Sequence, residues 1–390
     1  MESKKDINFT TTNAGLYLYD KLWNKHELDH IFDSTIPKHS GKEYSKIAHN
    51  LLNRLLIDAN SMTALAEKDK EEYFLAKNAQ LHRTSYGRNL LKPNDKQRNS
   101  ILLKLNNKLI TKKEIHKHTI MIYDPTAIEA EGEEYENTKW VWDSCQDKMV
   151  IGYELNKLLL KTKKRINPLG YNVNGDSNPI KMFKQGRIQL GINKVVFDAD
   201  TKFGGMKFYK QLDNEEFLFY TKAVVDWKFN YGFDMNIKQL RKRFMYLLKR
   251  NGVLSRTVYK DDMKLRLIFV LSDKRVILTN DFRCSPIEAY NYYVDRWKIE
   301  TSFKEEKQNL GLDKLPTWKF EGVKTHFLLC ILAYVLSQFI VSKVKIANGI
   351  KLIKRRVVKT FAVVVEAIKG IELEFDVRYR FRYVFGLEFG

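Results

Sequence analysis

The spacing of apolar residues divides the chain into an amino-terminal helical part and a following part that contains short strands. Residues 1–117 carry apolar positions three and four residues apart, as in "EYSKIAHNLLNRLLIDA", which is the period of an amphipathic helix. From residue 118 onward the pattern changes to short β-branched runs: "HTIMIYD", "MVIGYEL" and "INPLGYNV". A helical stretch, "PIKMFKQGRIQLGI", and another run, "KVVFDAD", follow them. This order predicts an α/β fold with a mixed sheet flanked by helices.

A further helix is predicted to begin near residue 286 and to carry four polar side chains on one face. Residues 285–288 read Ser-Pro-Ile-Glu, in which Ser is an N-cap, Pro occupies the first helical position and Glu reaches back to the cap. At about 100° per residue, Tyr293, Arg296, Glu300 and Lys307 fall within roughly 60° of one another. Such a face either looks into an anionic partner or is a solvated surface with an ordinary Arg296–Glu300 ion pair.

The charge balance indicates a polyanionic partner. The 390 residues include 68 Lys and Arg against 47 Asp and Glu, which gives a formal charge of +21, and 13% of the residues are aromatic. Nucleic acid or an anionic membrane surface would suit that excess of positive charge. One basic helical stretch, residues 78–118, has ten basic and two acidic side chains, and it either binds duplex phosphates or forms a solvated surface.

Other features argue against a membrane protein and against a disulfide or zinc site. The longest apolar run, residues 327–341, has 15 residues, whereas a membrane span needs about 20, so we expect a buried helix. The opening "MESKKDINFT" has no apolar stretch after its charges, so we expect a cytoplasmic protein. Cys145, Cys284 and Cys330 are far apart and odd in number, so a bound metal is expected to have oxygen ligands.

Three carboxylates stand in places that suit a divalent-metal site. Asp124 closes the run "IMIYD" and Asp198 closes "VVFD", so we expect both at strand ends, while Glu300 lies on the predicted helix face. Phosphodiester cleavage by two divalent ions needs one carboxylate to bridge the ions and others to hold each ion from the side. Mg²⁺ prefers oxygen ligands and keeps several waters, so three side chains can suffice. The spacing leaves four competing acids open: Glu129, Asp200, Glu305 and Glu306.

The four polar residues of the helix face stand as Tyr-x2-Arg-x3-Glu-x6-Lys, which resembles the YREK signature of bacterial and archaeal DDE insertion-sequence transposases. All four positions match without a gap. "DPT" at 124–126 is similar to the family's first-aspartate strand, and "VVFDADTKFGG" is similar to its second-aspartate strand and turn. "RVILTND" before the helix and "HFLLCILAYVL" after it are similar as well, so that the resemblance covers roughly residues 118–342.

The resemblance implies a ribonuclease-H-like core that a mostly β insertion domain interrupts between the second and third acids. The 101 residues between Asp198 and Glu300 leave room for such an insertion. The expected parts are a helical DNA-binding domain (1–117), a first core part (118–224), the insertion (225–283), a second core part (284–342) and a basic C-terminal extension (343–390).

The resemblance also implies roles for the charged residues. Asp124, Asp198 and Glu300 would be the catalytic residues and would bind two Mg²⁺ or Mn²⁺ ions. Arg296 would grip a phosphate of the transposon end as a bidentate fork, and Lys307 would do so as a point charge.

Three aromatic side chains complete the implied DNA contacts. Tyr293 would donate a hydrogen bond to a phosphate or pack on a sugar. Trp297 lies near Tyr293 on the helix and would either border the DNA channel or pack in the core. Trp227, in the expected insertion, would stack on a base extruded from the duplex.

The implied activity is that of a transposase that cuts DNA at terminal inverted repeats and joins the 3′-hydroxyl ends to a target. Its partners would be double-stranded DNA and a second copy of itself, in a synaptic complex on the nucleoid of a prokaryotic cell. Two alternatives stay open, namely a structure-specific nuclease and a descendant that binds DNA without catalysis. The chain departs from the family in two places. Pro125 follows the first aspartate, where the family more often has another residue, although it is compatible with an extended strand end. The sequence "DAD" leaves Asp200 as a rival to Asp198 for the second acid, but the apolar run "KVVF" before Asp198 favours Asp198.

Overall fold

The computed structural model describes most of the chain and leaves parts of both ends aside. The described residues are 9–11, 14–38, 41–57, 59–132, 134–163, 165–175, 179–198, 205–343 and 373–375. Asp200 and nearly all of the predicted extension 343–390 therefore lie outside the described residues. Within that extension, strand β13 (Leu373–Phe375) pairs antiparallel with β1 (Phe9–Thr11) near the start of the chain.

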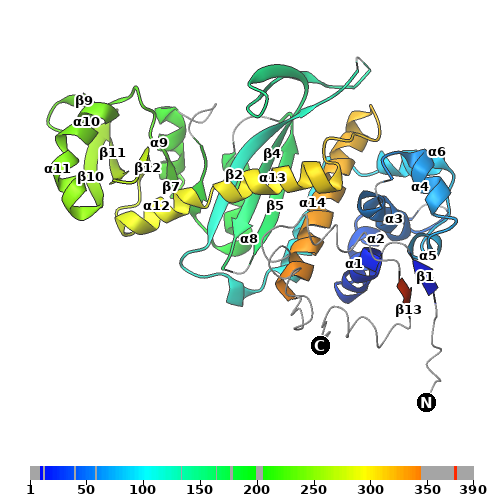
Figure 1. Cartoon of the computed structure of the whole chain (residues 1–390). Coiled ribbons are helices and arrows are strands. Elements are labelled where there is room, and N and C mark those ends of the chain that lie inside the picture. Colours follow the sequence, from blue (N-terminus) through cyan, green and yellow to red (C-terminus); the bar gives the residue numbers. More distant parts are fainter. Residues whose placement is uncertain are drawn as a thin grey trace.

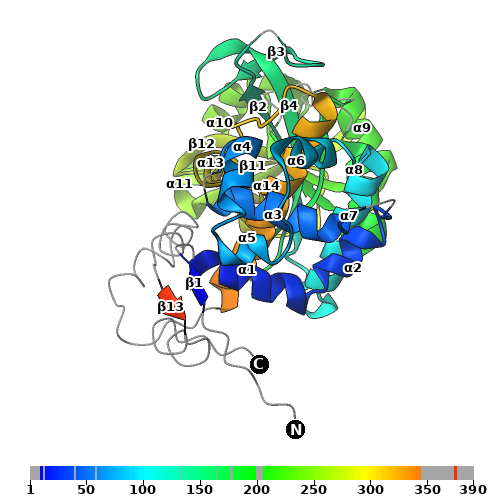
Figure 2. The ribbon, with the colours of Figure 1, turned by 90° about the vertical axis from the view of Figure 1, so that its right-hand side faces the viewer.

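The amino-terminal part is a group of short helices that pack on one another and on a later helix. They are α1 (Ala14–Lys25), α2 (Leu28–Asp33), α3 (Tyr44–Leu56), α4 (Met62–Lys68), α5 (Tyr73–Ala76), α6 (Arg83–Leu90), α7 (Asp95–Leu109) and a 3-10 turn at Lys112–Glu114. Asn94 and Gln97 form a reciprocal capping box that starts α7. Figures 1 and 2 show these helices gathered at one end of the molecule, beside α14 (Phe320–Lys343).

The centre of the molecule is a mixed sheet. Its first strands are β2 (Ile120–Glu129), β3 (Lys139–Asp143), β4 (Lys148–Lys161), β5 (Ile166–Val173), β6 (Lys194–Val196) and β7 (Leu218–Lys222). Strand β4 pairs antiparallel with β2 on one side and with β3 and β5 on the other, whereas β6 runs parallel to both β2 and β7. The prediction of a ribonuclease-H-like mixed sheet flanked by helices is confirmed.

The run at 120–123 is apolar throughout because β2 is buried on both faces. Ile120 and Ile122 belong to the core shared with the amino-terminal helices and α14. Met121 and Tyr123 belong to the opposite core, which is covered by α8 (Ile180–Leu190) and α9 (Met206–Asn214).

The predicted end of this strand is wrong. Strand β2 continues through Asp124 and Pro125 to Glu129, because β4 pairs with it along that whole length. The pairing of β2 with β6 covers only Met121 and Ile122. Pro125 therefore stands beyond the paired stretch on that side, where a missing backbone N–H costs no ladder hydrogen bond.

The segment predicted as an insertion extends the same sheet. It contains β8 (Lys228–Asn230), β9 (Asp234–Asn236), α10 (Ile237–Arg243), α11 (Met245–Asn251), β10 (Val253–Lys260), β11 (Met263–Val270) and β12 (Asp273–Thr279). Strand β12 pairs antiparallel with β7, and β11, β10, β8 and β9 follow in order. Two helices thus accompany the strands at this end of the molecule (Figure 1). The boundaries 225 and 283 stay predictions.

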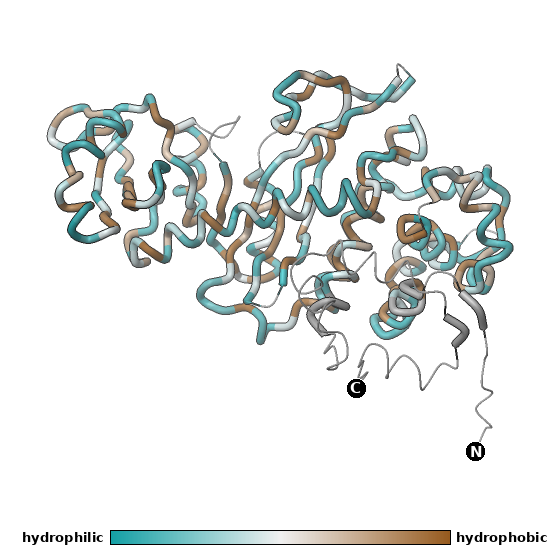
Figure 3. Tube along the Cα trace, in the orientation of Figure 1, coloured by the Kyte–Doolittle hydropathy of each residue, from teal (hydrophilic) through white to brown (hydrophobic). Residues whose placement is uncertain are grey.

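The predicted helix from residue 286 is present but consists of two segments. Helix α12 (Pro286–Val294) begins with the expected capping box between Ser285 and Glu288. Helix α13 (Trp297–Leu310) follows after Asp295 and Arg296, both of which keep right-handed helical backbone angles. In Figure 1, α13 crosses in front of the central sheet, and Figure 3 draws it mostly in hydrophilic colours.

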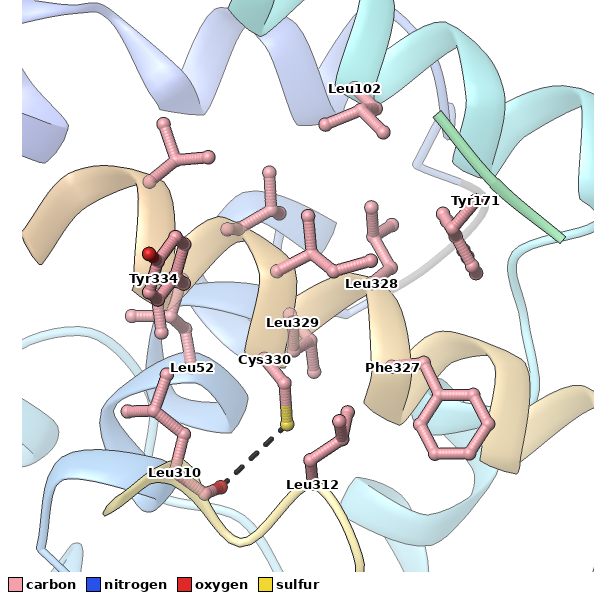
Figure 4. Close-up of a cluster of buried hydrophobic side chains, with 14 of the residues drawn as sticks. Leu52, Leu102, Tyr171, Leu310, Leu312, Phe327, Leu328, Leu329, Cys330 and Tyr334 are labelled. Atoms are coloured by element: carbon pink, nitrogen blue, oxygen red, sulfur yellow. Dashed lines mark hydrogen bonds between the residues drawn. The ribbon is translucent and has the colours of Figure 1, made fainter. Parts of the chain in front are cut away.

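Helix α14 is the apolar centre of the fold. Within the described part of the chain, one helix, at Phe320–Gln338, is long and apolar enough to cross a membrane, yet nearly all of that stretch is buried inside the protein. Figure 4 shows Phe327, Leu328 and Leu329 of α14 among side chains from other elements, and the Cys330 thiol donates to the carbonyl oxygen of Leu310 at the end of α13. The expectation of a buried helix at 327–341 therefore agrees with its described side chains, which end at Gln338 in that helix.

Candidate active site

The three predicted acids converge from three elements. Asp124 lies within β2. Asp198 lies two residues beyond the end of β6, the strand that runs parallel to β2, and Glu300 lies in the first turn of α13. Helix α13 packs against β2, which brings Glu300 to the same edge as the aspartates. The site is thus built at the carboxyl end of β6, beside a strand that continues past it.

A single guanidinium links the three acids. The Arg296 Nη1 atom is 3.3 Å from Oδ2 of Asp124, and its Nη2 atom is 3.4 Å from Oδ2 of Asp198. The same Nη2 atom is 2.5 Å from Oε1 of Glu300, one helical turn further along. Arg296 is 9% exposed, so these contacts are largely removed from water. The predicted Arg296–Glu300 pair is therefore one part of a cluster of half-buried acids around a buried guanidinium, and the alternative of an ordinary solvated surface is wrong.

The electrostatics reflect this burial. Burial raises the pKa of Asp124 to about 7, against the opposing effect of the Arg296 charge and with help from the negative charges of Glu300 and Asp198. For Arg296, burial disfavours the charged form, but the carboxylates of Asp124 and Asp198 outweigh it and raise the pKa above its ordinary value. The cluster thus has a strong preference for a cation at its centre.

The other two members of the predicted helix face lie on either side of this cluster. The Tyr293 hydroxyl donates to Oδ2 of Asp198 at 3.4 Å, and its ring is buried. The Lys307 Nζ atom donates to the carbonyl oxygen of Ala127 at 2.8 Å, on β2 just beyond Asp124. All four polar residues therefore face β2 and β6, as the helical spacing predicts.

A buried ion pair that the sequence analysis missed fixes α13 on the sheet. The Lys157 Nζ atom of β4 is 2.9 Å from both carboxylate oxygens of Glu306 and 2.7 Å from Oγ of Ser302, and neither Lys157 nor Glu306 is exposed. The ammonium also lies 4.2 Å from the centre of the Phe303 ring. Lys157 is the ladder partner of Asp124, so the two side chains project from the same face of the sheet.

Two of the four competing acids pair with lysines away from the Arg296 cluster. Glu306 is fully engaged by Lys157 beneath the helix. Glu129 is exposed at the far end of β2 and pairs with Lys148 at 3.9 Å. Asp200 lies outside the described residues.

The two candidate tryptophans differ in exposure. Trp297 is 65% exposed, so the alternative that it packs in the core is wrong. Trp227 is half-buried, with its ring edge against Tyr209 and the Lys260 ammonium 5.1 Å from its ring centre. Contact of either ring with DNA stays a prediction.

The carboxylates of Asp124, Asp198 and Glu300 would suit a hard divalent cation if the Arg296 guanidinium moved away from them. Carboxylate oxygens are the ligands that Mg²⁺ and Mn²⁺ prefer. With Arg296 between the carboxylates, no three acidic, histidine or cysteine side chains among the described residues are close enough to hold one ion. The buried positive charge at the centre of three acids nevertheless marks the place where a cation is stabilised.

Comparison with known proteins places the segment that carries the three acids in a family. The model of the family described as "Transposase DDE domain" matches residues 115–336, which is more than half of the chain and includes all three acids. No curated protein matches the sequence.

Solved structures give only weak similarity. The Drosophila P element transposase strand transfer complex matches at 12% identity over 58% of this chain and 56% of that chain, with a TM-score of 0.29. Ciona intestinalis endonuclease V in complex with an inosine-containing DNA matches at 12% identity over 51% of this chain and 86% of that chain, with a TM-score of 0.27. The chain thus spans little more than half of the P element protein, and overlap this low carries no argument. The family match at 115–336 is sufficient by itself: the chain belongs to the transposase DDE domain family.

Proposed function

We propose that the protein is a DNA transposase that cuts phosphodiester bonds at the ends of a mobile element and joins the freed 3′-hydroxyls to target DNA. The observation that carries the proposal is the convergence of Asp124, Asp198 and Glu300 on the buried guanidinium of Arg296. Enzymes of this family use divalent metal ions, and we propose two Mg²⁺ or Mn²⁺ ions held by these three carboxylates.

When bound, such ions activate a water or a 3′-hydroxyl as the nucleophile and stabilise the leaving oxygen. The residues of the chain supply the frame for that chemistry. Asp124 is held by the ladder of β2 and β4, and Glu300 is held by α13, which Lys157 fastens to the sheet. Tyr293 orients Asp198 through its hydroxyl.

Arg296 and Lys307 are proposed to exchange their internal partners for DNA phosphates. The guanidinium of Arg296 is planar and matches a phosphate as well as a carboxylate, so leaving the acids for a terminal phosphate conserves its hydrogen bonds. Lys307 donates to a backbone carbonyl, which is a neutral and weaker partner than a phosphate. Binding of the DNA end and loading of the ions would therefore favour each other.

Arg296→Gln is expected to strengthen metal binding in the absence of DNA. The substitution removes the guanidinium from the carboxylates, so free protein loses stability while added Mn²⁺ or Ca²⁺ raises its thermal midpoint more than that of the wild type. Thermal unfolding at increasing metal concentration measures this without any catalytic step. Arg187→Gln on α8, which removes a bond to the Glu215 carbonyl, is the control and should respond to metal like the wild type. If metal raises the thermal midpoint of Arg296→Gln and of the wild type equally, the guanidinium and the metal ion do not occupy the same place.

Lys307→Ala is expected to weaken binding of the DNA end and to lower its salt slope by about one unit, as loss of one phosphate contact does. Gel shifts with an end duplex at several salt concentrations measure the slope. Lys298→Ala is the matched control, because Lys298 is exposed on the same helix but about 140° from Tyr293. If both variants keep the wild-type slope, Lys307 does not contact phosphate.

The function itself is tested with the DNA that flanks the gene. Linear duplexes carrying its inverted repeats are incubated with the protein and Mg²⁺. Strand-joined products are expected. Cleavage without joining would favour a nuclease, and binding without cleavage would favour a descendant that has lost catalysis.

A further inference from the structure

Strands β3 and the first part of β4 form a projecting two-stranded ribbon with one apolar face exposed. Trp140 lies opposite Ile151 and Trp142 opposite Met149 in the ladder, so these four side chains share one face. Trp140 is 64% and Trp142 is 55% exposed, and Met149 and Ile151 are exposed as well. Exposed apolar side chains clustered in this way mark an interaction surface, and tryptophan is enriched where binding energy concentrates.

The ribbon is fixed to the strand that carries Asp124. On its inner face, Val141 and Val150 are buried against Ala127 of β2. Gly152 approaches β2 so closely that an added Cβ would lie 2.1 Å from the carbonyl oxygen of Ile128. The exposed face is therefore presented by a ribbon that packs closely on β2.

The charge around the ribbon favours a basic protein over nucleic acid as its partner. Residues 129–154 carry eight acidic and two basic side chains, in a chain whose formal charge is +21. Glu136 is paired with Lys319, but Glu131, Glu134 and Asp147 are exposed. Phosphates would be repelled there, whereas a basic protein surface with exposed aromatic side chains would be attracted.

Such a surface exists on the chain itself, on α10 and α11. Residues 237–251 contain six basic and no acidic side chains. Their apolar residues Ile237, Leu240 and Leu248 are buried, while Tyr246 is 77% exposed. Figure 1 shows the ribbon at the top and these helices at the far left of the molecule, so that contact between them requires two molecules.

We propose that the acidic ribbon of one copy binds the basic α10–α11 surface of a second copy. Two such contacts, related by a two-fold axis, close a symmetric dimer. The proposed function needs two copies to bring two DNA ends together, and the reason for this dimer rests on that function. Self-association itself can be measured whether or not the protein cuts DNA.

The first test is sedimentation velocity of the full chain over a range of concentrations, with and without an end duplex. Trp140→Ser combined with Trp142→Ser is expected to weaken association about tenfold or more, as loss of central tryptophans does. Both side chains are exposed, so the variant should fold, which circular dichroism checks. Ile188→Ser on α8 removes an even more exposed apolar residue elsewhere and should associate like the wild type.

The second test exchanges charges between the two surfaces. Asp147→Lys and Lys249→Glu are each expected to weaken self-association, since both residues are exposed on the proposed surfaces. An equimolar mixture should recover wild-type affinity. In a mixed dimer, the altered ribbon meets the altered helices and the unaltered ribbon meets the unaltered helices. Recovery on mixing supports the reciprocal contact.

Three results would overturn the proposal: a wild-type chain that stays monomeric with and without DNA, ribbon variants that associate normally, or ribbon variants that lose end-binding alone. The last would make the ribbon a DNA surface. Nicking of a single end is measured in parallel, because a wild type that dimerises without nicking contradicts the proposed function and leaves the dimer contact standing.

Discussion

Glu300→Gln is expected to reduce DNA nicking about a thousandfold or more. The amide keeps the size of the side chain but removes the charge that would hold a divalent ion, and ion-mediated charge stabilisation contributes several kcal/mol to the transition state, where about 1.4 kcal/mol is a factor of ten. Gel shift with an end duplex should show nearly unchanged binding, because Glu300 carries no positive charge toward phosphate.

The matched control is Glu129→Gln. Glu129 lies on the same strand as Asp124, but it is exposed and pairs with Lys148. Removing its charge should therefore leave nicking near the wild-type rate. Equal loss of nicking and end-binding in Glu300→Gln would mean that Glu300 holds the fold together. A strong loss of nicking in Glu129→Gln would mean that Glu129 is one of the metal ligands on β2.

Lys157→Met is expected to cost about 3–5 kcal/mol of stability, the usual effect of leaving a buried charge without its partner. Burial lowers the pKa of Lys157 and raises that of Glu306, and each charge opposes the shift of the other. Without the ammonium, the Glu306 carboxylate remains in a fully buried position beneath α13. Urea unfolding followed by tryptophan fluorescence measures the loss.

A double variant separates the charge from the packing. Lys157→Met with Glu306→Leu replaces both partners by apolar side chains of similar size, and most of the lost stability should return. If Lys157→Met alone is as stable as the wild type, the ion pair does not fasten α13. If the double variant is no better than the single one, packing against Ser302 and Phe303 accounts for the loss instead.

The parts of the site that sequence analysis predicted depend on short-range rules. The capping box at Ser285 starts α12 as expected, and the helical period brings Tyr293, Arg296 and Glu300 to one side. Apolar runs predicted the strands around Asp124 and Asp198, because a strand covered on both faces has few polar residues. The family resemblance then supplied the link between the two halves of the site.

The missed parts depend on pairing over long distances. Nothing local in "LNKLLLK" distinguishes Lys157 from a surface lysine, since its partner Glu306 is 149 residues away. Strand β2 passes through Asp124 and Pro125 because β4 supplies the ladder, and an apolar run that stops at Asp124 could not show this. The strands after residue 225 join the main sheet through β12 and β7, which is also a long-range pairing.

The ladder of β2 and β4 has one further consequence. Asp124 and Lys157 are direct partners in it, and alternate residues of a strand face opposite sides. A molecule in which either strand slips by one residue would turn its own member of the pair to the far side of the sheet. A slip of β2 would remove Asp124 from the three-acid cluster, while a slip of β4 would separate Lys157 from Glu306 beneath α13. If the proposed function holds, either register error would yield a copy that is unable to cut DNA.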